Sequence, residues 1–382
     1  MINKTIHYTK YMCRVLLFYI FRIFKIKQKR IFISNYRGNG YGDNAKYIVK
    51  HLLDSKLDIW WLIDKEKNID TDLFPDKINF VTKNSLKEIY IATTSKVWID
   101  NARKDPYYRK RKQQYYLQTW HGAISYKRIE GDAVDKLGRS YLRKAKRDSK
   151  MANAIISNGE WSKRLIKEAF WFKGEILNTG SPRCDGLFLD EIKVNEIKQK
   201  LGIANKYIVL YAPTFRNSHN LEIYDLDYNI LFEELNKVNK NTIILLRLHP
   251  NIKQRVTKLP KFVLDVTNYH DMYELLSISN ILITDYSSTM FEFLELKRQI
   301  YIYAPDYDDY IEERGVYFDK DILPFFISKS TKELIENIKN FNQEEYNYKI
   351  KKFKEIVQYK EDGISGKRIS TFLLTKLQSN QK

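Results

Sequence analysis

From Arg30 onward, short apolar runs of four to six residues alternate with longer amphipathic segments. The short runs have the length of buried strands, and the longer segments have the period of helices with one apolar face. This alternation predicts an α/β fold with parallel strands and crossover helices. The predicted strands are Arg30–Asn35, Ile59–Asp64, Val97–Asp100, Tyr115–Thr119, Ala154–Ser157, Glu175–Asn178, Tyr207–Tyr211, Thr242–Leu248, Phe262–Asp265, Ile281–Thr284 and Gln299–Tyr303. The predicted helices are Asn44–Leu53, Trp161–Phe170, Leu187–Leu201, Ile230–Val238, Tyr269–Ser277, Ser287–Leu296, Thr331–Phe341 and Glu344–Gln358.

A boundary near residues 172–180 divides these elements into two α/β halves of similar size, 30–175 and 176–382. Two Rossmann-like, doubly wound domains that face a cleft are the simplest architecture for this order. The least regular stretch is 101–150, whose portions 103–112 and 136–150 are dense in Lys and Arg. Because charge runs usually form solvated surface, we expect most of these charges to be exposed.

Residues 1–29 precede the α/β pattern and carry an apolar run, 15–21, bounded by Arg14 and Arg22. The run is much shorter than the about 20 residues needed to cross a bilayer. No small-residue cleavage site follows it, which argues against a secretory signal. As a helix, the segment would place a basic stripe opposite an apolar face, which predicts a helix lying in the surface of an anionic membrane. The alternative is a first helix packed on the protein's own core.

Composition and charge narrow the class of protein. The chain has 382 residues, of which 43% are hydrophobic and 14% aromatic, too many for a disordered protein. Cys13 and Cys184 are the only cysteines, which excludes a disulfide framework and a cysteine-rich metal centre and is typical of a reduced protein on the cytosolic side. The net charge of +19 indicates a polyanionic neighbour: nucleic acid, an anionic membrane or a phosphate-rich substrate. Eight Lys and Arg and no Asp or Glu lie in residues 1–30.

Unusual polar residues follow five of the predicted strands, at the edge where open α/β sheets bind ligands. They are Trp120-His121-Gly122, Ser157-Asn158, Pro213-Thr214, the pair Arg247 and His249, and Asp285. Together they predict one site at the carboxyl ends of the strands.

After Asp285, the predicted helix begins with two hydroxyl residues, Ser287 and Ser288. Free backbone N–H groups, the helix dipole and two hydroxyls form a cradle suited to phosphate. The alternative is that Asp285 or Ser287 merely caps the helix. A cap accounts for one polar residue, but it does not account for the cluster of Asp285, Ser287 and Ser288. Glu292, one turn further on, is placed to reach sugar hydroxyls.

The two histidines of this set have different predicted roles. His121 is the candidate general base, because an imidazole has a pKa near neutrality and Gly122 permits a close backbone approach. Lys127 and Arg128 follow and could hold an anion. Arg247 and His249 point to the same side of a strand, which suits a pyrophosphate or a departing phosphate; a structural His249 packed under Pro250 is the alternative.

No cofactor is predicted. The candidate His, Asp and Glu residues do not follow a metal-ligand spacing. The run Gly38-Asn39-Gly40-Tyr41-Gly42-Asp43 lacks the third glycine of a dinucleotide fingerprint at the required position. A loop that contacts the acceptor is the better interpretation of this run.

Five ordered motifs resemble those of the CDP-glycerol glycerophosphotransferase family, the enzymes that prime or polymerise teichoic acids and related phosphate-linked capsules. They are Gln118–Gly122, Ser181–Asp185, Tyr211–Arg216, Arg247–Pro250 and Thr284–Ser288. The later Asp362-Gly363 before Lys367-Arg368 is similar to the family's closing segment. The similarity spans about 30–370 and leaves residues 1–29 outside.

The resemblance implies a GT-B-like fold, a peripheral position on the cytoplasmic face of the membrane, and metal-independent transfer of an alditol phosphate from a CDP donor. It implies an acceptor domain at 30–175, a donor domain at 176–382, and His121, with Arg247 and His249, as the catalytic groups. The positions similar to donor-contacting residues are Trp120, Gly122, Ala123, Ile124, Arg183, Pro213, Thr214, Leu248, Ser287, Ser288 and Glu292. Lys127 and Asp285 join them as expected substrate-binding residues.

The chain departs from the family pattern at two positions. The loop Ala123–Lys127 is one residue longer than the usual one, and Glu292 stands where Asp is common. Glycerol, ribitol and other alditols are therefore all alternatives for the transferred group. The acceptor is expected to be a lipid-linked or polysaccharide molecule. A GT-B glycosyltransferase that uses a nucleotide sugar is one alternative. A non-enzymatic basic protein that binds membrane or nucleic acid is another, although we expect no nucleic-acid partner.

Overall fold

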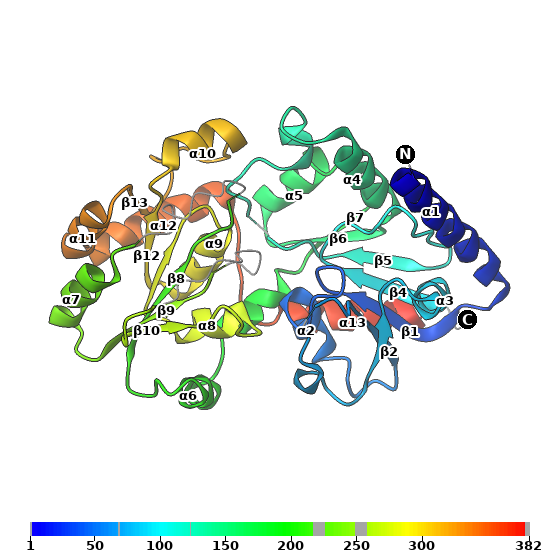
Figure 1. Cartoon of the computed structure of the whole chain (residues 1–382), viewed down its shortest axis with the longest axis horizontal. Coiled ribbons are helices and arrows are strands. Elements are labelled where there is room, and N and C mark those ends of the chain that lie inside the picture. Colours follow the sequence, from blue (N-terminus) through cyan, green and yellow to red (C-terminus); the bar gives the residue numbers. More distant parts are fainter. Residues whose placement is uncertain (1, 68, 123, 217–225, 249–257, 379–382) are drawn as a thin grey trace. The chain divides into compact units, whose positions relative to one another are not determined.

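The computed structural model describes residues 2–67, 69–122, 124–216, 226–248 and 258–378, and the side chains from Tyr8 onward (Figure 1). It forms two compact units, each built on one parallel sheet. Unit 1 comprises 1–123, 130–185 and 360–382, and unit 2 comprises 124–129 and 186–359. The predicted α/β fold with two parallel sheets is therefore confirmed.

Unit 1 has a seven-stranded sheet in the order β3-β2-β1-β4-β5-β6-β7, in which every pairing is parallel. Its strands are β1 Lys27–Ser34, β2 Asp58–Ile63, β3 Ile78–Thr82, β4 Ser95–Asp100, β5 Tyr115–Gln118, β6 Ala154–Ser157 and β7 Glu175–Asn178. Its helices are α1 Ile2–Ile20, α2 Asp43–Val49, α3 Leu86–Thr94, α4 Arg139–Met151, α5 Glu160–Glu168 and α13 Ser365–Gln378.

The two faces of this sheet follow from strand alternation. In β1, Ile31 and Ile33 join the core beneath α2 and α13. Phe32, between them, points to the other face and contacts the rings of Trp98 and Tyr108. Because both faces are covered by apolar groups, the strands are continuous hydrophobic runs, as expected for a parallel sheet.

Unit 2 has a six-stranded parallel sheet in the order β10-β9-β8-β11-β12-β13. Its strands are β8 Tyr207–Ala212, β9 Thr242–Leu246, β10 Val263–Asp265, β11 Ile281–Thr284, β12 Gln299–Tyr303 and β13 Phe326–Ser328. Its helices are α6 Glu191–Lys200, α7 Tyr228–Val238, α8 Met272–Ile278, α9 Thr289–Phe293, α10 Tyr307–Arg314, α11 Thr331–Lys339 and α12 Gln343–Val357. One face of the sheet packs its β8, β9, β11 and β12 side chains against α7 and α11.

The division into units differs from the predicted boundary at 175/176. Residues 176–185 stay in unit 1 because β7 is the last strand of its sheet. Residues 360–382 return to unit 1, where Ile369 and Leu373 of α13 are fully buried against the sheet. Residues 124–129 lie in unit 2, where Lys127 bridges to Val316.

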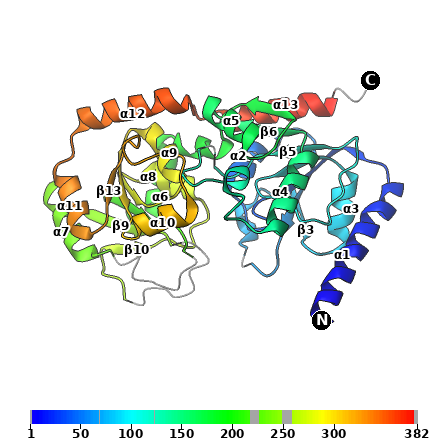
Figure 2. The ribbon, with the colours of Figure 1, turned by 90° about the horizontal axis from the view of Figure 1, so that it is seen from above.

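The amino-terminal segment forms helix α1, and Figure 2 shows it beside α3 at the edge of unit 1. Phe18 is fully buried and its ring lies 5.4 Å from that of Tyr108, so one side of the helix packs on the protein. Its other side carries exposed apolar side chains: Tyr8, Met12, Leu16, Tyr19 and Ile20, followed by Ile23 and Phe24 beyond the helix. Among the helices of the described ranges, none is long and apolar enough to cross a bilayer.

Candidate active site

The loop that follows β5 carries the candidate base of unit 1. Thr119 N donates to the Asp100 carbonyl at 2.8 Å, and Trp120 N donates to the side-chain oxygen of Gln118 at 2.8 Å. Trp120 adopts a left-handed conformation with φ 55°, which is uncommon for a bulky residue. These two hydrogen bonds therefore hold a sharp turn directly before His121.

The imidazole of His121 is oriented by the backbone. Its Nδ1 lies 2.7 Å from the Asn101 carbonyl oxygen, which can only accept, so Nδ1 carries the proton. Nε2 of the neutral ring is then left with its lone pair, as a general base requires. Burial lowers the pKa of His121 and outweighs the opposing effects of the Asn101 hydrogen bond and the Asp43 carboxylate. The ring is therefore neutral at pH 7.

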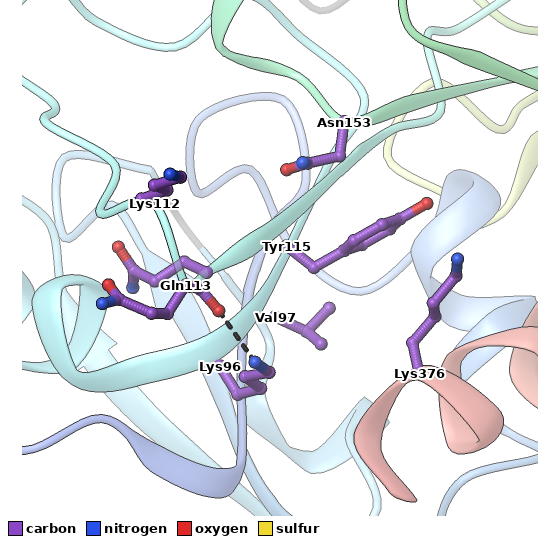
Figure 3. Close-up of a pocket in the computed structure, with 8 residues that line it drawn as sticks. Lys96, Val97, Lys112, Gln113, Tyr115, Asn153 and Lys376 are labelled. Carbon is purple, nitrogen blue, oxygen red and sulfur yellow. Dashed lines mark hydrogen bonds between the residues drawn. The ribbon is translucent and has the colours of Figure 1, made fainter. Parts of the chain in front are cut away.

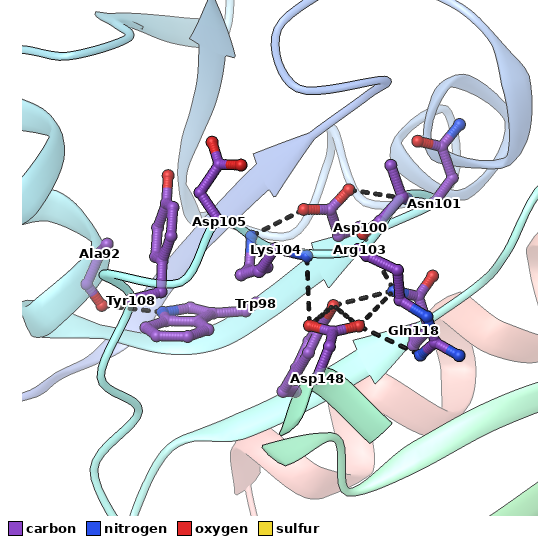
Figure 4. Close-up of polar contacts among 12 residues, drawn as sticks. Ala92, Trp98, Asp100, Asn101, Arg103, Lys104, Asp105, Tyr108, Gln118 and Asp148 are labelled. Atoms are coloured by element: carbon purple, nitrogen blue, oxygen red, sulfur yellow. Dashed lines mark hydrogen bonds and ion pairs between the residues drawn. The ribbon is translucent and has the colours of Figure 1, made fainter. Parts of the chain in front are cut away.

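A buried polar network supports this turn through Gln118, and Figure 4 shows part of the network. Asp148 accepts from Arg103 Nη1 at 3.2 Å and from the Gln118 side-chain nitrogen at 3.3 Å. Arg103 also forms a two-pronged pair with Glu130, and its guanidinium lies 5.1 Å from the ring of Trp120. Because Gln118 is anchored through one end of its amide, the other end is fixed as the acceptor for Trp120 N.

Arg103 and Lys104 are exceptions to the expectation that most charges of 103–112 and 136–150 are exposed. Both are almost fully buried, and Lys104 pairs with Asp100 at 2.8 Å. The hydrophobic pattern carried no signal for this network, because its members are charged residues on separate elements.

Arg183 lies in the same region of unit 1, where it contacts the first two residues of α2. Its guanidinium lies 3.1 Å from the Asp43 carboxylate, and its backbone N–H donates to the side chain of Asn44 at 3.0 Å. Asn44 in turn donates to the Trp120 carbonyl at 2.9 Å. Burial opposes ionisation of Asp43, but the charge of Arg183 and hydrogen bonds to the carboxylate outweigh it and lower its pKa. The structure thus brings together Trp120, His121 and Arg183, and adds Asp43 and Asn44.

The run of glycines before Asp43 is a braced turn after β1. The side-chain nitrogen of Asn35 donates to the Asn39 and Gly40 carbonyls. Gly38 has φ 97°, and a Cβ there would lie 2.8 Å from Asp64 N, so this position requires glycine. Tyr36, in the same turn, donates its hydroxyl to Asp43 at 2.9 Å.

In unit 2, the carboxyl ends of β8 and β11 are joined through Asp285. Its carboxylate is 1% exposed, accepts from Thr214 N at 2.9 Å and pairs with Arg216 at 2.8 Å. Arg216 also pairs with Asp306 at 2.8 Å. Asp285 therefore holds the turn at Pro213 and Thr214, where Pro213 is buried and Thr214 is partly exposed.

The two serines after Tyr286 differ in the hydrogen bonds of their side chains. Helix α9 begins at Thr289, two residues later than predicted. The Ser287 hydroxyl lies 2.7 Å from the Thr289 hydroxyl and accepts from Thr289 N at 3.3 Å, so it serves partly as a cap. Ser288 makes no side-chain cap hydrogen bond. Glu292 is 3% exposed, and its carboxylate accepts from the Tyr273 hydroxyl in the interior.

Unit 2 contains two candidate cations, Arg247 and Lys127, which are far apart in the sequence. Arg247 follows β9 and donates to the Tyr269 carbonyl at 2.9 Å; burial lowers its pKa to about 10, so it remains charged at neutral pH. Lys127 lies 5.8 Å from the ring of Tyr310. Burial lowers the pKa of Lys127, against the opposing charge of Asp285.

The remaining predicted residues divide by whether they are described. Leu248 is buried and donates its N–H to the Thr267 hydroxyl at 3.0 Å, and Ile124 is 2% exposed. Gly122 is partly exposed in the turn after His121. Ala123 and His249 lie outside the described residues. Within the described ranges, no group of three or more His, Cys, Asp or Glu side chains is placed to hold a metal ion.

Comparison with known families relates this arrangement to one group. The family model described as "CDP-Glycerol:Poly(glycerophosphate) glycerophosphotransferase" matches residues 16–375. The match begins before residue 30, so it includes part of the segment expected to lie outside the resemblance.

Individual relatives agree with the family match. The "Teichoic acid poly(glycerol phosphate) polymerase" of Bacillus spizizenii is 32% identical, over 93% of this chain and 95% of its own length. The "Teichoic acid glycerol-phosphate transferase" of Staphylococcus aureus is 32% identical, over 85% of this chain and 88% of its own length. The "Teichoic acid ribitol-phosphate primase" of B. spizizenii is 29% identical, over 93% of each chain.

Comparison with solved structures agrees with the family match. The Wall Teichoic Acid Polymerase TagF superimposes with a TM-score of 0.85 at 28% identity, covering 100% of this chain and 98% of the other. UDP-GlcNAc 2-epimerase from Neisseria meningitidis superimposes with a TM-score of 0.51 at 14% identity, covering 91% of this chain and 100% of the other. The second likeness concerns the fold alone.

Proposed function

Because this chain belongs to the CDP-glycerol:poly(glycerophosphate) glycerophosphotransferase family, we propose that it transfers an alditol phosphate from a CDP-alditol to an acceptor hydroxyl, with release of CMP, in teichoic-acid synthesis. The family match over residues 16–375 carries the proposal. The likeness to TagF, of which one variant was soaked with CDPG, supports CDP-glycerol as the donor class.

In this reaction the acceptor oxygen forms a bond to the distal phosphorus of the donor, and the bond from that phosphorus to the bridging oxygen breaks. The acceptor proton must leave, and the departing CMP must be stabilised. His121 takes the proton at Nε2, because Nδ1–H is held by the Asn101 carbonyl. A neutral imidazole is ready to accept a proton without a change of state.

The groups of unit 2 provide the charge for the diphosphate. Arg247 and Lys127 are cations, and the Ser287, Ser288 and Thr214 hydroxyls are hydrogen-bond donors. Such preorganised donors stabilise charge that develops on phosphoryl oxygens. Asp285, held by Arg216, is a positioning residue in this mechanism. His249 is proposed as a partner of Arg247 from the sequence motif alone.

The alditol is proposed to be glycerol. The first two relatives described above carry glycerol phosphate in their names, and the ribitol-phosphate primase is less similar at 29% identity. CDP-ribitol is the second donor to test. The acceptor is proposed to be a lipid-linked or polysaccharide hydroxyl.

We further propose that the protein is peripheral on the cytoplasmic face of the membrane. The exposed apolar side chains of α1 are the observation that favours this position. They are accompanied by the cations of residues 1–30, which contain no acidic residue. An apolar face with surrounding cations is typical of helices that lie in the surface of an anionic bilayer.

The test is CMP release by the purified chain with CDP-glycerol or CDP-ribitol, a membrane-lipid extract and a chelator. We expect His121→Ala to reduce the rate by about 100- to 10,000-fold, the usual contribution of a general base. His51→Ala is the matched control, since His51 is exposed at the end of α2. Turnover of a nucleotide sugar in place of the CDP-alditols would favour the glycosyltransferase alternative, and an unchanged rate in His121→Ala would contradict the assigned base.

A further inference from the structure

Unit 1 contains a second polar feature at the opposite edge of its sheet from His121. A pocket of about 240 Å³ opens near the amino ends of β4, β5 and β6 (Figure 3). Its lining residues are Lys96, Val97, Lys112, Gln113, Gln114, Tyr115, Asn153 and Lys376. Because the strands are parallel and rise about 3.3 Å per residue, the length of β4 separates this edge from the carboxyl edge by about 20 Å. The pocket is therefore distinct from the candidate active site.

The pocket is rich in positive charge. Three of its lining side chains are lysines, and none is acidic. Lys96 is only 6% exposed, and its ammonium donates to the Gln113 carbonyl at 2.8 Å. Among the described residues Lys96 forms no ion pair, and burial lowers its pKa. A buried ammonium without a counter-charge is costly, so this pocket favours an anionic occupant.

One carboxylate lies nearby and limits the excess charge. Glu175 accepts from the Tyr115 hydroxyl at 3.2 Å and lies 3.8 Å from the Lys376 ammonium. It offsets one of the three lysines. The remaining charge suits a phosphate group, whose oxygens accept from several ammonium donors at once.

The loop that lines the pocket also touches the amino-terminal helical segment. Arg111 donates to the Phe24 carbonyl at 2.7 Å, and Arg109 donates to the Tyr11 hydroxyl at 3.2 Å. Ile23 and Phe24, which end the exposed apolar row of α1, are 76% and 42% exposed. One loop thus contacts both the segment that carries the exposed apolar row and the cationic pocket. A phospholipid has the two complementary groups, apolar acyl chains and an anionic phosphate.

We propose that the pocket around Lys96 binds the phosphate headgroup of an anionic phospholipid while the exposed apolar row of α1 enters the membrane surface. The inference rests on the proposed membrane position and adds a specific lipid site to it. Lys96 and Lys112 contact the phosphate, and Lys376 shields its outer side. The site would fix which edge of unit 1 meets the membrane, leaving the carboxyl edge with His121 away from the lipid surface.

The probe is dihexanoyl-phosphatidylglycerol below its micelle-forming concentration, titrated calorimetrically into the full chain at constant ionic strength. Dihexanoyl-phosphatidylcholine, glycerol 3-phosphate and inorganic phosphate are titrated in parallel. We expect the phosphatidylglycerol analogue to bind, and the double variant Lys96→Met with Lys112→Gln to weaken binding at least tenfold. The matched control is Lys27→Gln with Lys29→Gln, two exposed lysines at the amino end of β1 that lose the same charge outside the pocket.

Lys112→Gln alone keeps the test decisive if the Lys96 variant folds poorly, because Lys112 is exposed. Binding that is equal in the pocket and control variants would overturn the proposal, as would no binding of any probe. Equal binding of glycerol 3-phosphate would assign the pocket to soluble phosphate in place of lipid. CMP release measured with a lipid-free acceptor should be unchanged in the pocket variants, so loss of the lipid site and failure of the proposed transferase activity give different results.

Discussion

At the scale of single residues, Asp285 joins the Arg216 guanidinium to the backbone turn at Thr214 in unit 2. Its buried carboxylate pairs with Arg216 and accepts from Thr214 N. We expect Asp285→Asn to lower the free energy of unfolding by about 1–3 kcal/mol, because a buried donor loses its charged partner while Arg216 keeps Asp306. Urea denaturation measures this change. Asp309→Asn, at an exposed position of α10, should leave the free energy within about 0.5 kcal/mol of its starting value.

The protonation of His121 sets an expected pH dependence. Burial places its pKa below the ordinary 6.5, and only the neutral ring can act as a base. The acid limb of kcat/KM for CMP release should therefore be centred below pH 6.5. As pH falls through the lowered pKa, the ring gains a proton and the rate declines. An acid limb centred at or above pH 6.5 would contradict this assignment.

At the scale of elements, α1 has two sides that can be tested separately. Phe18→Ala should lower the free energy of unfolding by about 3 kcal/mol, because its buried ring packs on Tyr108. Leu16→Ala should leave stability nearly unchanged, since Leu16 is 59% exposed. It should weaken binding to anionic vesicles by about tenfold or more, the cost of losing one buried leucine. Vesicle co-sedimentation that is equal for Leu16→Ala and the unaltered chain would argue against membrane insertion of this face.

At the scale of the whole molecule, unit 1 depends on the last helix of the chain. Asp185 accepts from Ser365 N at 2.9 Å, and Ile369, Leu373 and Leu377 of α13 are buried in its core. Removing residues 360–382 would expose this core at about 1.5–3 kcal/mol for each lost side chain. The sum is comparable to the whole stability of a domain, so the shortened chain should lose its cooperative thermal unfolding.

Circular dichroism on heating is the measurement, with removal of residues 379–382 as the control. These four residues follow the end of α13. A shortened chain ending at 359 that keeps the original midpoint would show that unit 1 folds without α13.

Most strands were predictable because they are continuous buried runs. β6, β7, β11 and β12 have the predicted bounds. β3 was missed because it is an edge strand with polar Asn79 and partly exposed positions. α4 was missed because its thirteen residues are mostly charged, and only Ala145, Asp148 and Ser149 are buried.

The order of polar residues along the chain determined where the chemistry lies: His121, Arg247, Asp285 and the hydroxyls of Ser287 and Ser288 all follow strands. This was predictable because the carboxyl edge of a parallel sheet is set by chain direction. Which nitrogen of His121 carries the proton was decided only by tertiary structure. Tertiary structure alone also decided that Lys127 belongs to unit 2.

These features depend on partners that are far apart in sequence. Arg103 and Asp148, for example, are 45 residues apart, yet they pair in the network that includes Gln118, which holds the turn before His121. Local periodicity reports which face of an element is buried, and the sequence therefore determined the elements and their order. Packing brings distant donors and acceptors together, and a hydrogen bond between them leaves no periodic signal along the chain. The geometry of the site was consequently decided by the fold.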